Sequence, residues 1–167
     1  MGDMTLEKFN FNPKTDLIFD IKVNESCKSC KRYGLTGCCP PKIGSFDYYK
    51  KLLPKYKHGL LLVLKFKIND NKDWKLLGKQ SSLELHRELL KERDKIFNEG
   101  NYFSIILGGG SCKWCEKCSI PCKFPQYRAI PIEATGINVV KTIKKFGYKL
   151  DFPVKDSFYR IGMILWG

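Results

Sequence analysis

All eight cysteines of this chain lie in two short segments, and this clustering limits what the chain can become more than any other feature. The first segment holds Cys27, Cys30, Cys38 and Cys39, and the second holds Cys112, Cys115, Cys118 and Cys122. Dense cysteines often form a disulfide framework in small secreted proteins, but a chain of 167 residues can bury a core without such cross-links. The clustered thiols therefore indicate metal binding or redox chemistry, and we take all eight as candidate ligands.

The second segment has the spacing C-x2-C-x2-C-x3-C, the run in which bacterial ferredoxins hold [4Fe–4S] clusters. Short spacers let the backbone wrap a cluster and present a sulfur to successive corners. Zinc sites more often join two C-x2-C halves across a longer spacer, so the spacing favours iron–sulfur and leaves zinc as the alternative. In those ferredoxins a proline follows the fourth cysteine directly, whereas here Lys123 and Phe124 precede Pro125. Whether Cys122 completes its own cluster or a neighbouring one stays open.

Three glycines, Gly108, Gly109 and Gly110, precede the second segment at the end of an expected strand. Because glycine has no Cβ, the main chain can approach a ligand there and aim its N–H groups at it. We therefore predict that these glycines contact the cofactor, with an ordinary turn as the alternative. The stretch is not a phosphate-binding loop, since no Lys-Ser or Lys-Thr pair follows at the required distance.

The first segment begins with C-x2-C and has a further thiol seven or eight residues later, which is typical of half a metal site. The side chains of adjacent cysteines diverge, so either Cys38 or Cys39 is expected to be a spare or to bind something else. Gly34 and Gly37 allow tight turns between the ligands.

Hydrophobic patterning predicts one domain over residues 1–167, of the α/β or α+β class. Strands are expected at 16–23, 58–68, 102–107 and 157–166, and helices at 45–53, 81–100 and 137–146. Ser81 and Glu84 match a capping box at the start of the longest helix. The predicted fold is a mixed sheet covered by helices, with two cysteine-rich metal-binding loops.

The net charge of +13 at pH 7 comes almost entirely from lysine. Proteins that read nucleic-acid sequence rely on arginine for bidentate base contacts, so the composition argues against nucleic acid and favours an acidic redox partner or client protein. No apolar run approaches the ~20 residues of a membrane helix, and no secretory signal is present. We therefore expect a cytoplasmic protein without a membrane association.

At the level of whole motifs the sequence resembles a known family. The pattern C-x2-C-x2-YG…CPP, followed by G-x-C-x2-C-x2-C…C-x2-P…EA-x-GI, is similar to small cysteine-rich predicted metal-binding proteins of anaerobic bacteria and archaea, catalogued as domain of unknown function 2284. The resemblance runs from about Asp16 to Trp166. It implies seven ligands, Cys27, Cys30, Cys39, Cys112, Cys115, Cys118 and Cys122, with Cys38 as an addition. It implies metal binding but no established reaction.

From these observations we expect an iron–sulfur protein with one or two [4Fe–4S] clusters, acting in electron transfer or in the maturation of a partner enzyme. One alternative is an enzyme with an open three-cysteine metal site. Another is a zinc-binding protein or nucleic-acid interaction module.

Overall fold

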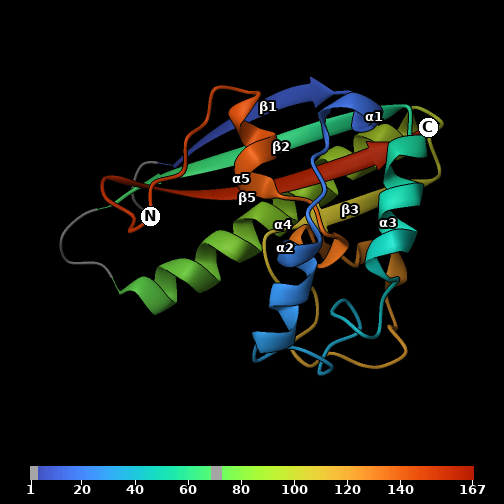
Figure 1. The fold of residues 1–167 in the computed structure, drawn as a ribbon, viewed down its shortest axis with the longest axis horizontal. Coiled ribbons are helices and arrows are strands. Elements are labelled where there is room, and N and C mark those ends of the chain that lie inside the picture. The colour runs from blue at the N-terminus through green and yellow to red at the C-terminus, as the bar shows by residue number, and fades with distance from the viewer. Residues whose placement is uncertain (1–3, 69–72) are drawn as a thin grey trace.

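A mixed five-stranded sheet forms the centre of the computed structural model, which describes residues 4–68 and 73–167 (Figure 1). Its strands are β1 (Met4–Phe11), β2 (His58–Lys67), β3 (Ser104–Gly108), β4 (Ile130–Pro131) and β5 (Ser157–Trp166), in the order β1-β2-β5-β3-β4. The β3–β4 pair is parallel and the other neighbours are antiparallel. The expected mixed sheet with helices is confirmed, as an α+β fold.

Strand β2 lies inside the sheet, between β1 and β5, and its side chains are apolar on both faces. Successive side chains of a strand point to opposite faces, so Leu61 and Val63 enter one core while Leu62 and Leu64 enter the other. All four are at most 1% exposed. This is the burial expected of a near-continuous apolar run.

One face of the sheet is covered by α4 (Trp74–Asn98), the longest helix. Leu85 and Leu89 pack from this helix against Leu62 and Ile164 of the strands. Helix and sheet approach closely at Gly162 of β5, where a Cβ atom would lie 2.8 Å from a methyl carbon of Leu89. In the described part of the chain, no helix is long and apolar enough to cross a bilayer.

The shorter helices lie apart from α4 (Figure 1). They are α1 (Pro13–Asp16), α2 (Ile21–Ser26), α3 (Phe46–Leu52) and α5 (Val139–Lys144). Tyr49 of α3 and Ile143 of α5 belong to the second core, with Val63 and Met163 of the sheet. The Ser45 hydroxyl caps α3 by accepting the Tyr48 N–H at 3.2 Å.

The capping box predicted at Ser81 is wrong, because α4 already begins at Trp74. Asp73 is the N-cap, and its Oδ1 accepts the N–H groups of Lys75 at 2.9 Å and Leu76 at 3.2 Å. Ser81 lies inside the helix, where its hydroxyl bonds to the Gly78 carbonyl. Asp73, which comes earlier in the chain than Ser81, therefore satisfies the free N–H groups at the start of the helix.

The strand predicted over residues 16–23 is also wrong. Asp16 ends α1, and Phe19 makes an isolated antiparallel bridge with Ile137. The Asp20 carboxylate then accepts the Lys22 N–H at 3.0 Å and starts helix α2. Strand β1, whose polar and apolar residues alternate imperfectly, was not expected from the sequence.

Two long loops extend from the same end of the fold (Figure 1). The first joins α2 to α3 and contains a short 3-10 turn at Cys27–Ser29. The second joins the parallel strands β3 and β4. The two cysteine segments lie in these loops.

Candidate metal centres

The two cysteine loops lie against each other and are joined by direct hydrogen bonds. The Gly37 N–H donates to Cys118 Sγ at 3.3 Å, and the Cys112 N–H donates to Cys38 Sγ at 3.2 Å. In the other direction, Arg128 Nη1 donates to the Gly37 carbonyl at 3.3 Å. Segments more than 70 positions apart in the chain therefore meet, and backbone donors already point at sulfur.

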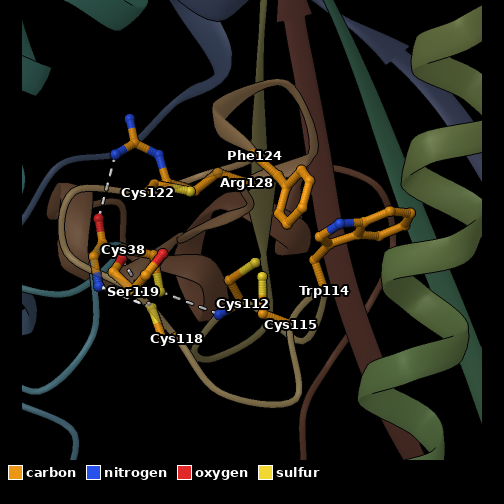
Figure 2. A pocket seen from close by; sticks show the side chains of 10 residues that line it. Cys38, Cys112, Trp114, Cys115, Cys118, Ser119, Cys122, Phe124 and Arg128 are labelled. Carbon is orange, nitrogen blue, oxygen red and sulfur yellow. Dashed lines mark hydrogen bonds between the residues drawn. The ribbon is translucent and has the colours of Figure 1, made fainter.

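Five thiols line one cavity between these loops (Figure 2). They are the four of the second segment, Cys112, Cys115, Cys118 and Cys122, together with Cys38 of the first segment. Trp114, Phe124 and Arg128 complete much of the wall. We call this the five-thiol cavity. Its free volume of about 30 Å³ matches the liquid volume of a single water molecule, so the loops would have to move outward to hold a cluster.

The remaining three thiols, of Cys27, Cys30 and Cys39, line a separate cavity of about 230 Å³. Glu133 also lines this three-thiol cavity, as do Gly110 and Ser111. Neighbouring residues are thus divided between two cavities, with Cys38 in one and Cys39 in the other, although their sulfurs are only 3.9 Å apart. Because their side chains diverge, Cys38 and Cys39 each lie beside a different group of thiols.

Hydrogen bonding makes Cys38 the more acidic of this pair. The bond from the Cys39 thiol lowers the pKa of Cys38 to about 6, although burial opposes it, and bonds from the Thr36 hydroxyl and the Cys112 N–H add to the effect. The same contact and burial raise the pKa of Cys39. Of the two thiols, Cys38 is therefore the one that loses its proton more easily.

Burial is the largest cause of the pKa shifts of three further groups at the two cavities, Cys112, Cys27 and Glu133. It raises the pKa of Cys112 and that of Cys27, where the charges of Glu133 and Cys30 act in the same direction. It also raises the pKa of the Glu133 carboxyl. A nearby cation such as a metal ion would reverse these shifts by favouring the charged forms.

The three glycines line a small cavity with Cys112 at the start of the second segment, and the last of them also reaches the three-thiol cavity. Gly110, at φ +88°, lines this cavity. Gly108 and Gly109 allow close packing, since a Cβ on either would lie 3.3 Å from Ala129 or from the Ile161 carbonyl. Gly110 therefore lies between the two cysteine segments, and contact of the three glycines with a cofactor stays a prediction.

His86 supports the second cysteine loop from helix α4, a role that the sequence did not reveal. Its Nδ1 accepts the Lys113 N–H at 3.3 Å, which leaves Nε2 to donate to the Tyr127 carbonyl at 2.8 Å. Trp114 stacks on the Tyr127 ring with centroids 4.2 Å apart. Both ring nitrogens of His86 are engaged, so this histidine positions the loop and is not available as a metal ligand. The apolar helix face on which it lies was the only signal in the sequence.

The donor set is suited to a thiolate-bound metal centre: the ligands are soft sulfurs, and backbone N–H groups point at three of them, those of Cys30, Cys38 and Cys118. Within residues 4–68 and 73–167, however, no three His, Cys, Asp or Glu side chains are placed to hold one metal ion. The thiols surround their cavities without converging on a single point.

These features define an α+β protein with two thiol-lined cavities in adjoining loops. The chain belongs to the family of predicted metal-binding proteins DUF2284, whose model matches residues 13–166. Comparison with curated proteins found no match, and comparison with solved structures found none. Metal binding is therefore the property that family membership supports.

Proposed function

We propose that this protein carries two [4Fe–4S] clusters and transfers electrons to or from a partner protein. The observation that carries the proposal is the presence of two neighbouring cavities, each lined by at least three thiols. Cysteine thiolates are the usual ligands of such clusters. The second loop would hold one cluster, and Cys27, Cys30 and Cys39 would hold the other.

The spacing of the cysteines along the chain supports clusters over zinc. The sulfurs around one tetrahedral zinc ion lie about 3.8 Å from one another, as a Zn–S bond of ~2.3 Å requires. Cluster thiolates bind separate irons and therefore stand farther apart. The second segment has the C-x2-C-x2-C-x3-C run in which thiolates hold such a cluster, so its spacing favours the second arrangement.

The contact between Cys38 and Cys39 supports electron transfer. Their sulfurs lie 3.9 Å apart, yet each faces a different cavity. Centres held at the two cavities would be close neighbours, connected by one peptide unit. Such proximity allows an electron to pass between them inside the protein.

The charge of the two loops supports an acidic partner. Residues 27–42 and 112–128 contain eight basic side chains and one acidic side chain, Glu116. The basic ones are Lys28, Lys31, Arg32, Lys42, Lys113, Lys117, Lys123 and Arg128. They would offset the negative charge of thiolate-bound clusters and attract an acidic protein surface. Trp114 and Phe124, both partly exposed at this end, would supply apolar contact area.

The partly exposed thiols also suit a reducing cytoplasm, as in an anaerobe.

Metal and sulfide analysis after purification without oxygen tests the proposal. The wild type should be brown and contain about eight irons and eight acid-labile sulfides per chain. Cys115→Ser and Cys30→Ser should each lose about half of the iron, because each removes a thiol from a different cavity. Ser119→Ala is the control within the five-thiol cavity and should keep all of it. A colourless protein with stoichiometric zinc would overturn the proposal.

A further inference from the structure

The three-thiol cavity has one cysteine fewer than a cubic cluster has irons. A carboxylate, that of Glu133, lines the same cavity. We propose that Glu133 is the fourth and exchangeable ligand of the metal centre at Cys27, Cys30 and Cys39, and that this centre binds a small anionic molecule. This inference depends on the iron–sulfur function proposed above. It assigns different tasks to the two centres, with electron transfer at the five-thiol cavity and ligand binding at the three-thiol cavity.

The backbone around Glu133 is connected to the helix that leads to Cys27. Glu133 begins a 3-10 turn directly after β4, closed by a bond from the Gly136 N–H to the Glu133 carbonyl at 2.9 Å. Asn24 of α2 donates its side-chain N–H to the Ala134 carbonyl at 2.7 Å. The carboxyl and the first thiol are thus carried by segments that are bonded to each other.

In the part of the chain that the structure describes, the Glu133 carboxyl is bound by no neighbouring side chain, although it borders two cavities. In the described residues, no side chain forms an ion pair or hydrogen bond with it. Arg160 attracts it from a distance, but the guanidinium donates instead to Ser81 Oγ and to the Gly78 carbonyl, each at 3.0 Å. Burial disfavours the charged form of this carboxyl, and a metal ion at the three thiols would provide a positive charge that favours it.

A carboxylate is the ligand in this set that exchanges most easily. Thiolates are soft ligands suited to iron–sulfur centres, whereas carboxylates are hard and prefer other metals. A metal position held by Glu133 would therefore resemble the open position of catalytic metal sites, which a substrate can occupy.

A further cavity, of about 390 Å³, adjoins the three-thiol cavity and provides room for the small anionic molecule. It shares Glu133 and Gly110 with the three-thiol cavity. Its wall is largely apolar, including Leu150 and Phe152, and it contains the cationic side chain of Arg160. A small organic anion with an apolar part would fit this lining and reach the metal when Glu133 is displaced.

Cyanide, a small anion that binds to iron with an open position, tests the inference in the complete chain reconstituted without oxygen. The readouts are iron content and the electron paramagnetic resonance (EPR) spectrum of the reduced clusters. In the wild type, cyanide should change about half of the cluster signal, since one of two centres is open. Glu25→Gln, an exposed carboxyl on α2, is the matched control and should respond like the wild type.

Two variants of Glu133 separate a ligand from a residue that merely supports the fold. Glu133→Cys should keep the full iron content and lose the cyanide response, because a thiolate is not displaced. Glu133→Ala should keep the response and reach it at a lower cyanide concentration, since no carboxylate competes. A wild type with full iron and no cyanide response overturns this inference alone, as does an unchanged response in Glu133→Cys. An iron-free wild type overturns the proposed function and this inference with it.

Discussion

Cys38 and Cys39 show how much depends on single side chains in this protein. Cys39 shares its cavity with two other thiols, whereas Cys38 joins four. A cluster in the five-thiol cavity needs only four thiolates, so Cys38 is the dispensable member there. We therefore expect Cys39→Ala to lose about half of the iron and Cys38→Ala to lose little.

Iron and sulfide analysis of both variants, purified in parallel without oxygen, checks this expectation. The wild type and Ser119→Ala provide the reference for full occupancy. Equal iron content in Cys38→Ala and Cys39→Ala would show that the division of the pair between two cavities has no bearing on metal binding.

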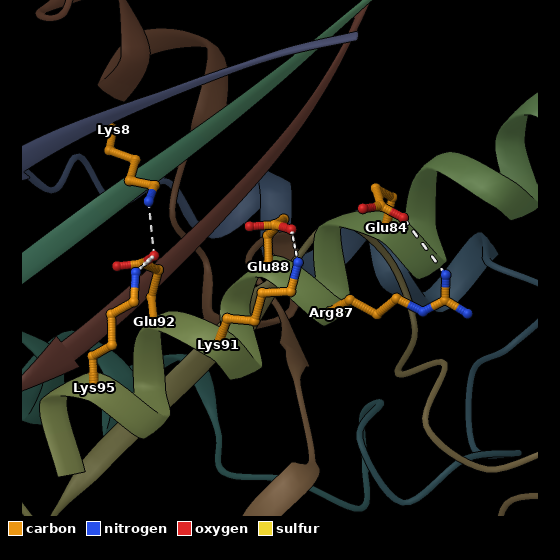
Figure 3. A network of polar contacts seen from close by, with 7 residues as sticks. All are labelled: Lys8, Glu84, Arg87, Glu88, Lys91, Glu92 and Lys95. Atoms are coloured by element: carbon orange, nitrogen blue, oxygen red, sulfur yellow. Dashed lines mark hydrogen bonds and ion pairs between the residues drawn. The ribbon is translucent and has the colours of Figure 1, made fainter. Parts of the chain in front are cut away.

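At the scale of elements, an ion-pair network joins helix α4 to the edge strand β1 (Figure 3). Glu92 accepts from Lys8 of β1 and from Lys95 of the helix, both at 2.7 Å. Burial by itself would raise the pKa of Glu92, but these two lysines outweigh it and lower the pKa. The charged carboxylate consequently favours the folded state.

A carboxyl with a lowered pKa stabilises the fold above its unfolded pKa of about 4.5, and the stabilisation is lost as the pH falls through the folded pKa. Glu92→Gln should therefore lower the free energy of unfolding by about 1 kcal/mol at pH 7, with the difference vanishing in acid. Urea unfolding of wild type and variant between pH 7 and pH 3 measures this. Glu88→Gln, whose partner Lys91 is exposed and on the same helix, should lower the stability less than Glu92→Gln does. A difference that does not depend on pH would contradict the assignment.

At the scale of the whole molecule, the packing of α4 on the sheet depends on the absence of a side chain at Gly162. An added Cβ would lie 2.8 and 2.9 Å from the two methyl carbons of Leu89 and 3.0 Å from Leu85. Both leucines are at most 2% exposed and have little room to move. Gly162→Ala should therefore destabilise the fold by about 1–3 kcal/mol through overpacking.

The matched control is Gly78→Ala, which adds the same methyl group within α4. Its Cβ would meet only Arg160, at 3.7 Å, an ordinary contact. Alanine is also the better helix former, so this variant should be more stable than the wild type by about 0.5–1 kcal/mol. Thermal or urea unfolding compares the two, and equal effects would contradict the close approach at Gly162.

Much of the sheet could be predicted because long apolar runs leave few alternatives. The segments 58–68 and 157–166 form β2 and β5 nearly as expected, since both are apolar enough to be covered on two faces. Helix α4 was placed too late because Ser81 and Glu84 imitate a cap, while Asp73 supplies the actual one. Local signals of this kind compete, and the one that also suits the tertiary packing prevails.

Cysteine spacing determined, by itself, that thiols gather in two groups, because residues two or three positions apart must share a loop. Only the tertiary structure decided that Cys38 faces the second group, that Glu133 borders the cavity of the first, and that His86 holds the second cysteine loop. These relations depend on contacts between segments far apart in the chain, such as the bond from the Gly37 N–H to Cys118. The physical reason is that spacing limits only near neighbours, whereas the sheet and α4 determine which loops meet.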